Sequence, residues 1–454
     1  MKSSRREFLK NTAFAGAGLV LAPQIFAGDS ISRERKAAGA LEEICVALIG
    51  CGAQGNVLLD AIMRMNRALG VRIVAVCDIW DFKLGATVRR LKANGRDVRG
   101  YADFREMLAR EKSLDAVFIA TPDFCHAPQT IACLDAGLHV YCEKMMAENI
   151  ENARAMVRAR HVSGKLLQIG HQRRSNPFYM WTRERLFPAK ILGRVTHAFA
   201  QWNRAVSRDI VAPKKFQPDT ALLREFGYED AHQFLNWRWF KKYSGGPISD
   251  LGAHQIDVFN WFLGDPVSVL AAGGNDYYKN HEWFDNVTCT FEHATPDGPA
   301  RATYQVLTTT SYGGGYFEAF TGDEGSLRLS EKISLIRAYQ EPRSPIDWQE
   351  YVRRGLLDLA PEIQSANVGN DDDFDARASA SVPAAEFVFP QKITFGNKTI
   401  HQPHAENFIR AIRGNAKLNC DAEEAFRAEA PIYRVNEAVA AERLIRYAPE
   451  DFSV

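Results

Sequence analysis

Two groups of ionisable side chains have the types and spacing that proton transfer beside a developing charge requires. Asp250, His254 and Asp257 follow one another at intervals of four and three residues, so on one helix they would share a face. Histidine has an ordinary pKa of about 6.5, and a neighbouring carboxylate stabilises its charged form. Lys144, which follows Glu143, is a cation that could stabilise negative charge on an oxygen atom. We therefore predict that His254 transfers a proton, Lys144 stabilises charge, and Asp250 orients the histidine or binds a substrate hydroxyl.

The same residues have a plainer interpretation. A His–Asp pair on a helix is also typical of a surface or capping contact, and a Glu-Lys pair is typical of a solvated surface. Residue types alone leave these alternatives open.

A glycine-rich turn lies between two patterned segments near the start of the chain. Residues 44–49 form a continuous apolar run, which is typical of a strand buried on both faces of a parallel sheet. The turn follows at once, and residues 57–63 then have helical periodicity. In a strand–turn–helix context, such glycines let the backbone approach a pyrophosphate at the helix N-terminus. The residues predicted to contact a dinucleotide here are Gly50, Gly52, Ala53, Gln54 and Gly55.

An acidic residue follows the second apolar run. Residues 71–77 form that run, and Asp78 ends it about 20 residues after the glycines, as in dinucleotide-binding domains. A carboxylate there accepts the ribose hydroxyls and repels a 2′-phosphate, so NAD is favoured over NADP.

Strands and helices alternate through the rest of the first domain, which we place at residues 41–170. The alternation predicts a doubly wound parallel sheet of the Rossmann type, and ligands bind beyond the carboxyl ends of its strands. Thr121, Pro122 and Asp123 fall at one of these ends, and Glu143 and Lys144 at another. We predict that all of these except Asp123, to which we assign no role, bind the cofactor. His126 either faces the same cleft or caps a helix. The predicted strands are 115–120, 138–141 and 166–169, and the predicted helices are 103–110, 127–136 and 150–161.

Residues 171–454 are predicted to form an α+β substrate-binding domain, with part of the C-terminal segment packing back on the first domain. Alternating strands at 193–204, 286–292, 301–309 and 325–329 favour an open, mostly antiparallel sheet. Residues 205–242 are irregular and rich in aromatic residues, of which Trp237 forms either a substrate wall or ordinary core. Residues 335–395 have little pattern and are predicted to be a solvated insertion. No metal site is predicted at its acidic patch, 370–373.

Three charged residues follow the last predicted strand of the first domain. His171, Arg173 and Arg174 either face the cleft and contact substrate, as we also expect for Asp257, or form surface ion pairs.

Composition narrows the possible partners. The formal net charge is +1, which gives no electrostatic reason to expect nucleic acid or an anionic membrane. The eight cysteines contain no C-x-x-C pair and are predicted to be structural thiols.

The first residues are typical of a targeting signal. A basic start, a short apolar stretch and Ala27 as a small residue predict a secretory signal over residues 1–28. The adjacent Arg5 and Arg6 resemble a twin-arginine (Tat) signal, which predicts export of the folded protein to the periplasm or beyond through the Tat machinery.

Together these motifs resemble the Gfo/Idh/MocA oxidoreductases. The resemblance implies a Rossmann domain followed by an open sheet flanked by helices on one face. It also implies that Lys144, Asp250 and His254 are catalytic. One departure from the family pattern is Met145, which stands where a proline is usual. In the first domain the resemblance rests on Gly50-x-Gly52-x-x-Gly55, Asp78, Ala120-Thr121-Pro122 with His126, and Cys142-Glu143-Lys144. Beyond it, the matching motifs are Gly170-His171-Gln172-Arg173-Arg174-x-x-Pro177, the segment from Gly245-Gly246 to Asp257 that contains Asp250 and His254, and His404-x-x-Asn407-Phe408.

Three functional hypotheses follow. The first is NAD-dependent hydride transfer at a hydroxyl carbon of a sugar, glycoside or polyol, with a tightly held cofactor and a homo-oligomer formed through the C-terminal sheet. The second is a redox-neutral glycoside hydrolase or lyase acting through a 3-keto intermediate. The third is a non-catalytic nucleotide-binding protein, whose function His254→Ala would leave intact.

Overall fold

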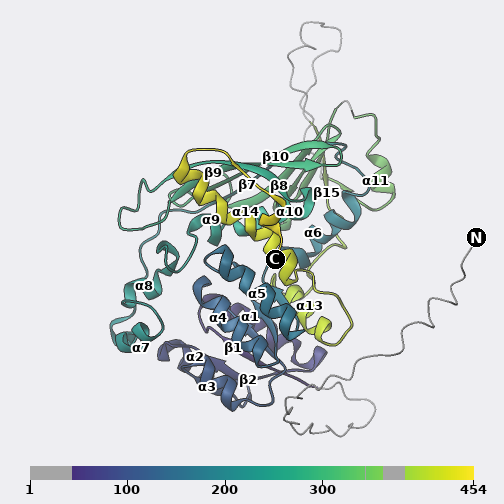
Figure 1. Ribbon diagram of the computed structural model, residues 1–454. Helices are drawn as coiled ribbons and strands as arrows, with labels where there is room; N and C mark the ends of the chain where they lie inside the picture. The colour runs from purple at the N-terminus through teal and green to yellow at the C-terminus, as the bar shows by residue number, and fades with distance from the viewer. Residues whose placement is uncertain (1–42, 343, 361–383) are drawn as a thin grey trace, which may run out of the picture. The chain divides into compact units, whose positions relative to one another are not determined.

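A computed structural model describes residues 43–342, 344–360 and 384–454 (Figure 1). The predicted signal at residues 1–28 and the acidic patch at 370–373 lie outside these ranges. Among the described residues, no helix is both long enough and apolar enough to cross a bilayer.

The first domain is built on a six-stranded parallel sheet, which confirms the predicted Rossmann fold. Its spatial order is β3-β2-β1-β4-β5-β6. The sequence prediction missed α2 and the short, polar β3. The strands are β1 (Ile44–Ile49), β2 (Val71–Cys77), β3 (Arg99–Tyr101), β4 (Ala116–Ile119), β5 (His139–Cys142) and β6 (Leu167–Ile169). The helices are α1 (Ala53–Leu69), α2 (Asp81–Ala93), α3 (Phe104–Arg110), α4 (Asp123–Asp135) and α5 (Ile150–Ser163).

Helices cover both faces of this sheet, and each face has its own core. One core joins α1 and α2 to Phe408 of α13 (Gln402–Ile412), while the other joins α3, α4 and α5 to Phe426 of α14 (Ala422–Ala441). Every residue of β1 and β4 is buried, as a strand covered on both sides must be. The C-terminal helices therefore complete the first domain.

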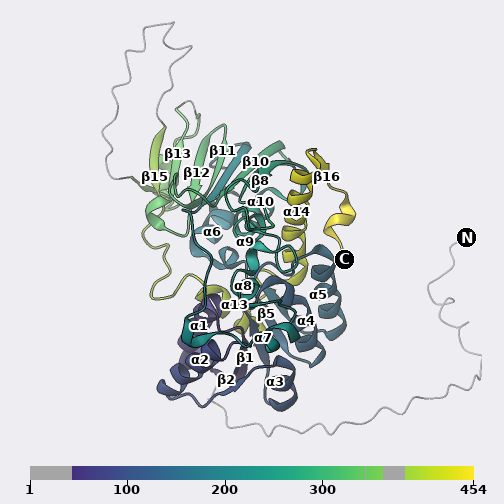
Figure 2. The same ribbon diagram turned by 90° about the vertical axis from the view of Figure 1, so that its left-hand side faces the viewer.

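The second domain is a ten-stranded mixed sheet in the described residues, in the order β14-β15-β13-β12-β11-β7-β10-β9-β8-β16. β7 and β10 pair in parallel, and the other pairs are antiparallel. Helices α6 (Pro177–Trp181), α10 (Ala253–Leu263) and α14 pack on one face (Figure 2). The strands are β7 (Val195–Asn203), β8 (Pro266–Gly274), β9 (Asn286–Thr295), β10 (Gly298–Leu307), β11 (Tyr316–Gly322), β12 (Gly325–Leu329), β13 (Arg337–Gln340), β14 (Asp358–Leu359), β15 (Ala385–Val388) and β16 (Ile445–Arg446).

The region predicted to be a solvated insertion, residues 335–395, is partly regular where the structure describes it. Besides β13, β14 and β15 it contains α11 (Gln349–Arg353). Trp348 and Phe387 are buried in the core of the second sheet, so apolar packing orders this segment despite its weak sequence pattern.

The helix predicted to carry both Asp250 and His254 is broken. α9 (Pro247–Asp250) ends before α10 (Ala253–Leu263) begins. At Gly252 a Cβ atom would lie 2.3 Å from the main-chain oxygen of Ile248, so the close turn between the two helices requires glycine. Asp250 therefore ends one helix, and His254 lies in the first turn of the next.

Candidate functional site

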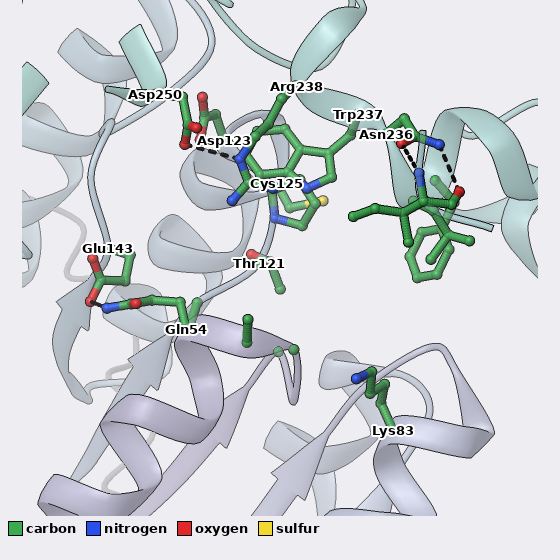
Figure 3. A pocket seen from close by; sticks show the side chains of 18 of the residues that line it. Gln54, Lys83, Thr121, Asp123, Cys125, Glu143, Asn236, Trp237, Arg238 and Asp250 are labelled. Atoms are coloured by element: carbon green, nitrogen blue, oxygen red, sulfur yellow. Dashed lines mark hydrogen bonds and ion pairs between the residues drawn. The ribbon is translucent and has the colours of Figure 1, made fainter. Parts of the chain in front are cut away.

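One large cavity connects the glycine turn to the second domain. Its volume is about 990 Å³, and it opens beyond the carboxyl ends of β1, β2, β4 and β5. Figure 3 shows Gln54 and Glu143 below, and Asp123, Arg238 and Asp250 above. The polar side chains that line the substrate end are Asp123, Lys144, Gln172, Arg204, Arg238, Asp250, His254, Thr308, Tyr316, Glu331 and His401.

The glycine turn has the geometry of a phosphate-binding loop. Gly50 has φ +92°, and a Cβ atom on Gly55 would lie 1.9 Å from the Gly50 main-chain oxygen. A Cβ atom on Gly52 would meet nothing within 4 Å, so this position faces open space. No side chain caps the start of α1, whose first N–H groups therefore remain available to an anion. The turn fits the pyrophosphate of a dinucleotide.

Asp78 lies beside this turn, where a ribose would follow. Its two carboxylate oxygens accept hydrogen bonds from the main-chain N–H groups of Cys51, at 2.7 Å, and Trp80, at 2.8 Å. Burial raises the pKa of Asp78, although those two hydrogen bonds oppose the shift. The carboxylate is thus fixed against the turn, with lone pairs left for ribose hydroxyls.

The remaining predicted cofactor residues lie around the floor of the cavity. Gln54 donates a hydrogen bond to Glu143 at 2.9 Å (Figure 3), and Thr121 donates to Gln129 at 2.7 Å. Ala53 and Pro122 also line the cavity.

His126 is placed differently. It is buried, does not line the cavity, and both of its ring nitrogens lie 2.7 Å from main-chain oxygens, those of Thr121 and Met145. It joins the loops after β4 and β5, so it supports the cofactor floor from behind.

Lys144 and Asp250 meet across the two domains. The Lys144 ammonium donates to the Asp250 main-chain oxygen at 2.5 Å and lies 3.7 Å from its Oδ1. Arg238 Nε lies 3.0 Å from the same Oδ1. Burial alone would raise the pKa of Asp250, but Arg238 and Lys144 hold it well below its usual range. The Lys144–Met145 peptide bond is cis.

Asp123 is a second carboxyl group at this end; we predicted that it lies at the ligand-binding edge of the sheet but assigned it no role. It is 4% exposed and accepts a hydrogen bond from Ser244 Oγ at 3.0 Å. Burial raises the pKa of Asp123 to about 8, against the opposing charge of Lys144. The signal was present in the sequence, because Asp123 follows Thr121 and Pro122 beyond the end of a buried strand.

His254 lines the cavity next to these charges. Burial, reinforced by Lys144 and Arg173, lowers its pKa well below the ordinary value, so the imidazole is neutral near pH 7. Its Nδ1 is buried without a hydrogen-bond partner among the described residues. Within those residues the Asp250 carboxylate pairs with Arg238 and Lys144 and no bond joins it to His254, so of its two predicted roles the binding of a substrate hydroxyl remains the prediction.

Four residues predicted to contact substrate lie behind the cavity wall instead. His171 Nε2 lies 2.8 Å from a Glu429 oxygen, and Arg174 pairs with Asp257 at 2.8 Å. Arg173 pairs with a buried carboxylate of β11, that of Glu318. His171, Arg173, Arg174 and Asp257 are each at most 4% exposed, and none lines the cavity. They form a buried charge network between the domains, because each charge there has an opposite partner.

Aromatic side chains complete the wall. Trp237 lines the cavity, as do Trp202 and Tyr316, whose rings lie 4.5 Å apart. The Trp202 ring centroid lies 5.5 Å from that of His254. Among the described residues, no group of three or more His, Cys, Asp or Glu side chains could hold a metal ion.

A glycine turn opening a helix, with a carboxylate at the end of the next strand, defines a dinucleotide-binding α/β protein with a second, sheet-based domain. Residues 44–171 match the model of the oxidoreductase family with an NAD-binding Rossmann fold, and residues 189–328 match the model of the GFO/IDH/MocA C-terminal domain. Together the matches cover more than half of the chain, which belongs to the Gfo/Idh/MocA family.

Known proteins similar to this chain include dehydrogenases. A 4-carboxy-2-hydroxymuconate-6-semialdehyde dehydrogenase of Sphingobium is 30% identical over 146 residues, 32% of this chain and 44% of that protein. An inositol 2-dehydrogenase of Saccharopolyspora erythraea is 28% identical over 295 residues, 63% of this chain and 73% of that protein. The chain spans about half the length of the first curated relatives it matches.

A solved levoglucosan dehydrogenase in complex with NADH has the same fold. It superposes with a TM-score of 0.66 at 17% identity, covering 90% of this chain and 100% of that one.

Proposed function

We propose that this protein is an NAD-dependent oxidoreductase acting at a hydroxyl-bearing carbon of a sugar, glycoside or polyol. The observation that carries the proposal is the single cavity that joins the open glycine turn to Lys144, Asp250 and His254. NAD, when bound, supplies the hydride acceptor or donor.

The protein's own residues would manage the proton and the charge. Because the Nδ1 of His254 is shielded, Nε2 is the nitrogen available to take the hydroxyl proton during oxidation. A neutral imidazole can accept that proton. The Lys144 cation stabilises negative charge on the same oxygen, and the ionised Asp250 holds Lys144 and Arg238 in place.

The lining favours a carbohydrate. Trp202, Trp237 and Tyr316 offer aromatic faces, which pack well against the C–H faces of a sugar ring. Gln172 and Glu331, on the same wall, offer hydrogen-bonding groups for hydroxyls.

The first test is nucleotide content followed by turnover. The purified protein should release NAD(H) on denaturation and reduce NAD with a sugar or polyol from a panel. Lys144→Met should lower kcat by a factor of about 10²–10⁴ while dinucleotide binding persists. Lys83→Met, in the same cavity but beside Asp78, should change cofactor affinity rather than kcat. A protein that binds no NAD(H), or a Lys144→Met variant with full activity, would refute the proposal.

A second candidate function is favoured by Asp123. A redox-neutral lyase or hydrolase needs an acid to protonate the leaving group, and a buried carboxyl with its pKa raised to about 8 holds a proton at neutral pH. Incubation with aryl glycosides distinguishes the two. Release of the phenol without net change in NADH indicates the redox-neutral reaction, whereas one NADH formed per substrate indicates a dehydrogenase.

Export is part of the proposal and rests on Arg5 and Arg6. The full chain expressed in a Tat-competent bacterium should fractionate outside the cytoplasm. The Arg5→Lys, Arg6→Lys double variant should remain inside. Equal distribution of the two proteins would contradict export by this route.

We also propose association through the outer face of the second sheet. Phe199 and Leu270 are 37% and 53% exposed on its strands. Light scattering should show an oligomer that Leu270→Glu weakens, and a monomeric wild-type protein would contradict it.

A further inference from the structure

A segment of the second domain packs on the first domain along the cavity, from the turn after β2 to Arg238, which binds the Asp250 carboxylate. Residues 205–242, which we call the arm, contain η3 (Lys214–Phe216), α7 (Thr220–Glu225), α8 (Ala231–Leu235) and η4 (Trp237–Trp239). Figure 1 shows α7 and α8 apart from the second sheet and next to the first domain.

The arm is attached to the turn that follows β2. The Trp80 indole N–H donates to the Phe216 main-chain oxygen at 3.0 Å. The Phe82 ring stacks on the Phe216 ring with centroids 4.4 Å apart, and Trp80 meets Phe234 edge to face at 6.0 Å.

A second attachment is to the start of α4. The Phe124 and Tyr228 rings meet edge to face at 5.2 Å, and, one residue beyond the arm, the Tyr243 main-chain oxygen accepts from the Phe124 N–H at 3.3 Å. Ile79 and Phe124 pack in one apolar cluster with the arm residues Leu223 and Tyr228. The arm therefore bridges the loops that follow β2 and β4, on either side of the cavity.

The arm is also braced internally. The Asn236 side chain accepts from the Ile210 N–H at 2.7 Å and donates to the Ile210 oxygen at 3.0 Å. Asp209 binds His232 at 2.8 Å and, outside the arm, His281 at 2.9 Å. Residues 209–210 are thus held in place over the cavity.

Two apolar side chains of the arm are exposed to solvent. Ile210 and Val211 are 58% and 80% exposed, yet both line the same cavity as Asp78 and Trp80. In a Rossmann domain the pyrophosphate lies on the glycine turn and the adenosine ribose on the acidic residue, so the adenine follows beyond Asp78. That position lies between the β2–α2 turn and the arm.

We propose that the arm forms the outer wall of the adenosine subsite, so that the dinucleotide is enclosed between the two domains and leaves only when the arm detaches. This inference rests on the proposed function, because it places the same dinucleotide. The flat apolar faces of adenine would cover Ile210 and Val211.

The decisive measurement is the rate at which bound NADH leaves, followed by its fluorescence after mixing with excess NAD⁺. Phe216→Ala removes the stacking on Phe82 but keeps the main-chain acceptor, and Phe216 is already 40% exposed. It should speed NADH release about tenfold. The matched control is Tyr312→Ala, an aromatic side chain 85% exposed and outside the arm, which should release NADH at the wild-type rate.

Trypsin provides an independent readout. Arg208, Lys214 and Lys215 are exposed cleavage sites within the arm, and NADH should protect them. Unchanged release from Phe216→Ala together with unchanged cleavage in NADH would overturn the arm proposal while leaving the proposed function intact. A wild-type protein that binds no NADH would overturn the proposed function and this subsite with it.

Discussion

Asp123 and Asp250 lie in one cavity, but their surroundings change their proton affinities in opposite directions. Asp250 is paired with Arg238 and Lys144, which lower its pKa, so it stays ionised. Asp123 is more buried and accepts a hydrogen bond from the Ser244 hydroxyl, and burial raises its pKa. Two carboxyl groups separated in this way can serve as a proton donor and a fixed anion in one site.

This difference predicts a pH-dependent stability. Because the pKa of Asp123 is about 8 in the folded protein, above its ordinary 3.8, the folded state binds this proton more tightly than the unfolded state. The free energy of unfolding should therefore fall as pH rises from about 4 to about 8. Asp123→Asn should remove that fall, so its Tm advantage over the wild type should grow from pH 5 to pH 8.

Asp135→Asn, an exposed substitution at the far end of the same helix, is the control. A constant Tm difference between Asp123→Asn and the wild type across this range would show that Asp123 ionises normally.

At the scale of elements, α14 reaches the loop that carries Lys144. Glu429 on α14 is fully buried, accepts the Met146 N–H at 2.7 Å and binds His171 at 2.8 Å. It fixes the main chain two residues beyond Lys144, so it acts as a positioning residue.

Removing this carboxylate should affect both stability and turnover. Glu429→Ala should lower the free energy of unfolding by about 3–5 kcal/mol, since it leaves buried partners unpaired. It should also lower kcat more than it changes KM, while Glu429→Gln, which keeps an acceptor for the Met146 N–H, should restore much of kcat. Glu437→Ala, exposed on the same helix, is the control. Equal kcat loss in the Gln and Ala variants would exclude the positioning role.

The local sequence pattern correctly predicted those elements whose structure depends on residues close to them in the sequence. The apolar runs and the glycine turn of the first domain are such elements, and they place Gly52 and Asp78 at the cavity. The helix break at Gly252 was not predicted. The spacing of Asp250, His254 and Asp257 assumed one continuous helix, whereas the close approach of Gly252 to Ile248 is visible only in the structure. The burial of Arg173 and Arg174 depends on Glu318 and Asp257, which lie far along the chain, so sequence spacing could not reveal it.

At the scale of the molecule, α14 belongs to two cores at once. Phe426 and Ala430 pack under the parallel sheet, while Val435 and Ala438 pack under the mixed sheet. If either domain unfolds and α14 unwinds with it, the other domain loses the helix residues that cover its core, and apolar surface of that domain becomes exposed.

We therefore expect the described domains to unfold as one cooperative unit. Calorimetry should show a single transition whose midpoint rises with NADH, with a stabilisation of about 2.7 kcal/mol at 100 times Kd. Two separated transitions, of which NADH shifts one, would contradict this coupling.

The position of α13 and α14 also has a consequence for biosynthesis. Phe408 and Phe426, near the end of the chain, complete the two cores of the domain that is made first. On the ribosome the first domain therefore waits until α14 has been synthesised, which at about 5–20 residues per second takes tens of seconds after β1. Cofactor binding then follows the synthesis of α14, and a chain truncated before residue 402 leaves a nucleotide-binding domain with both cores incomplete, which cellular quality control can recognise.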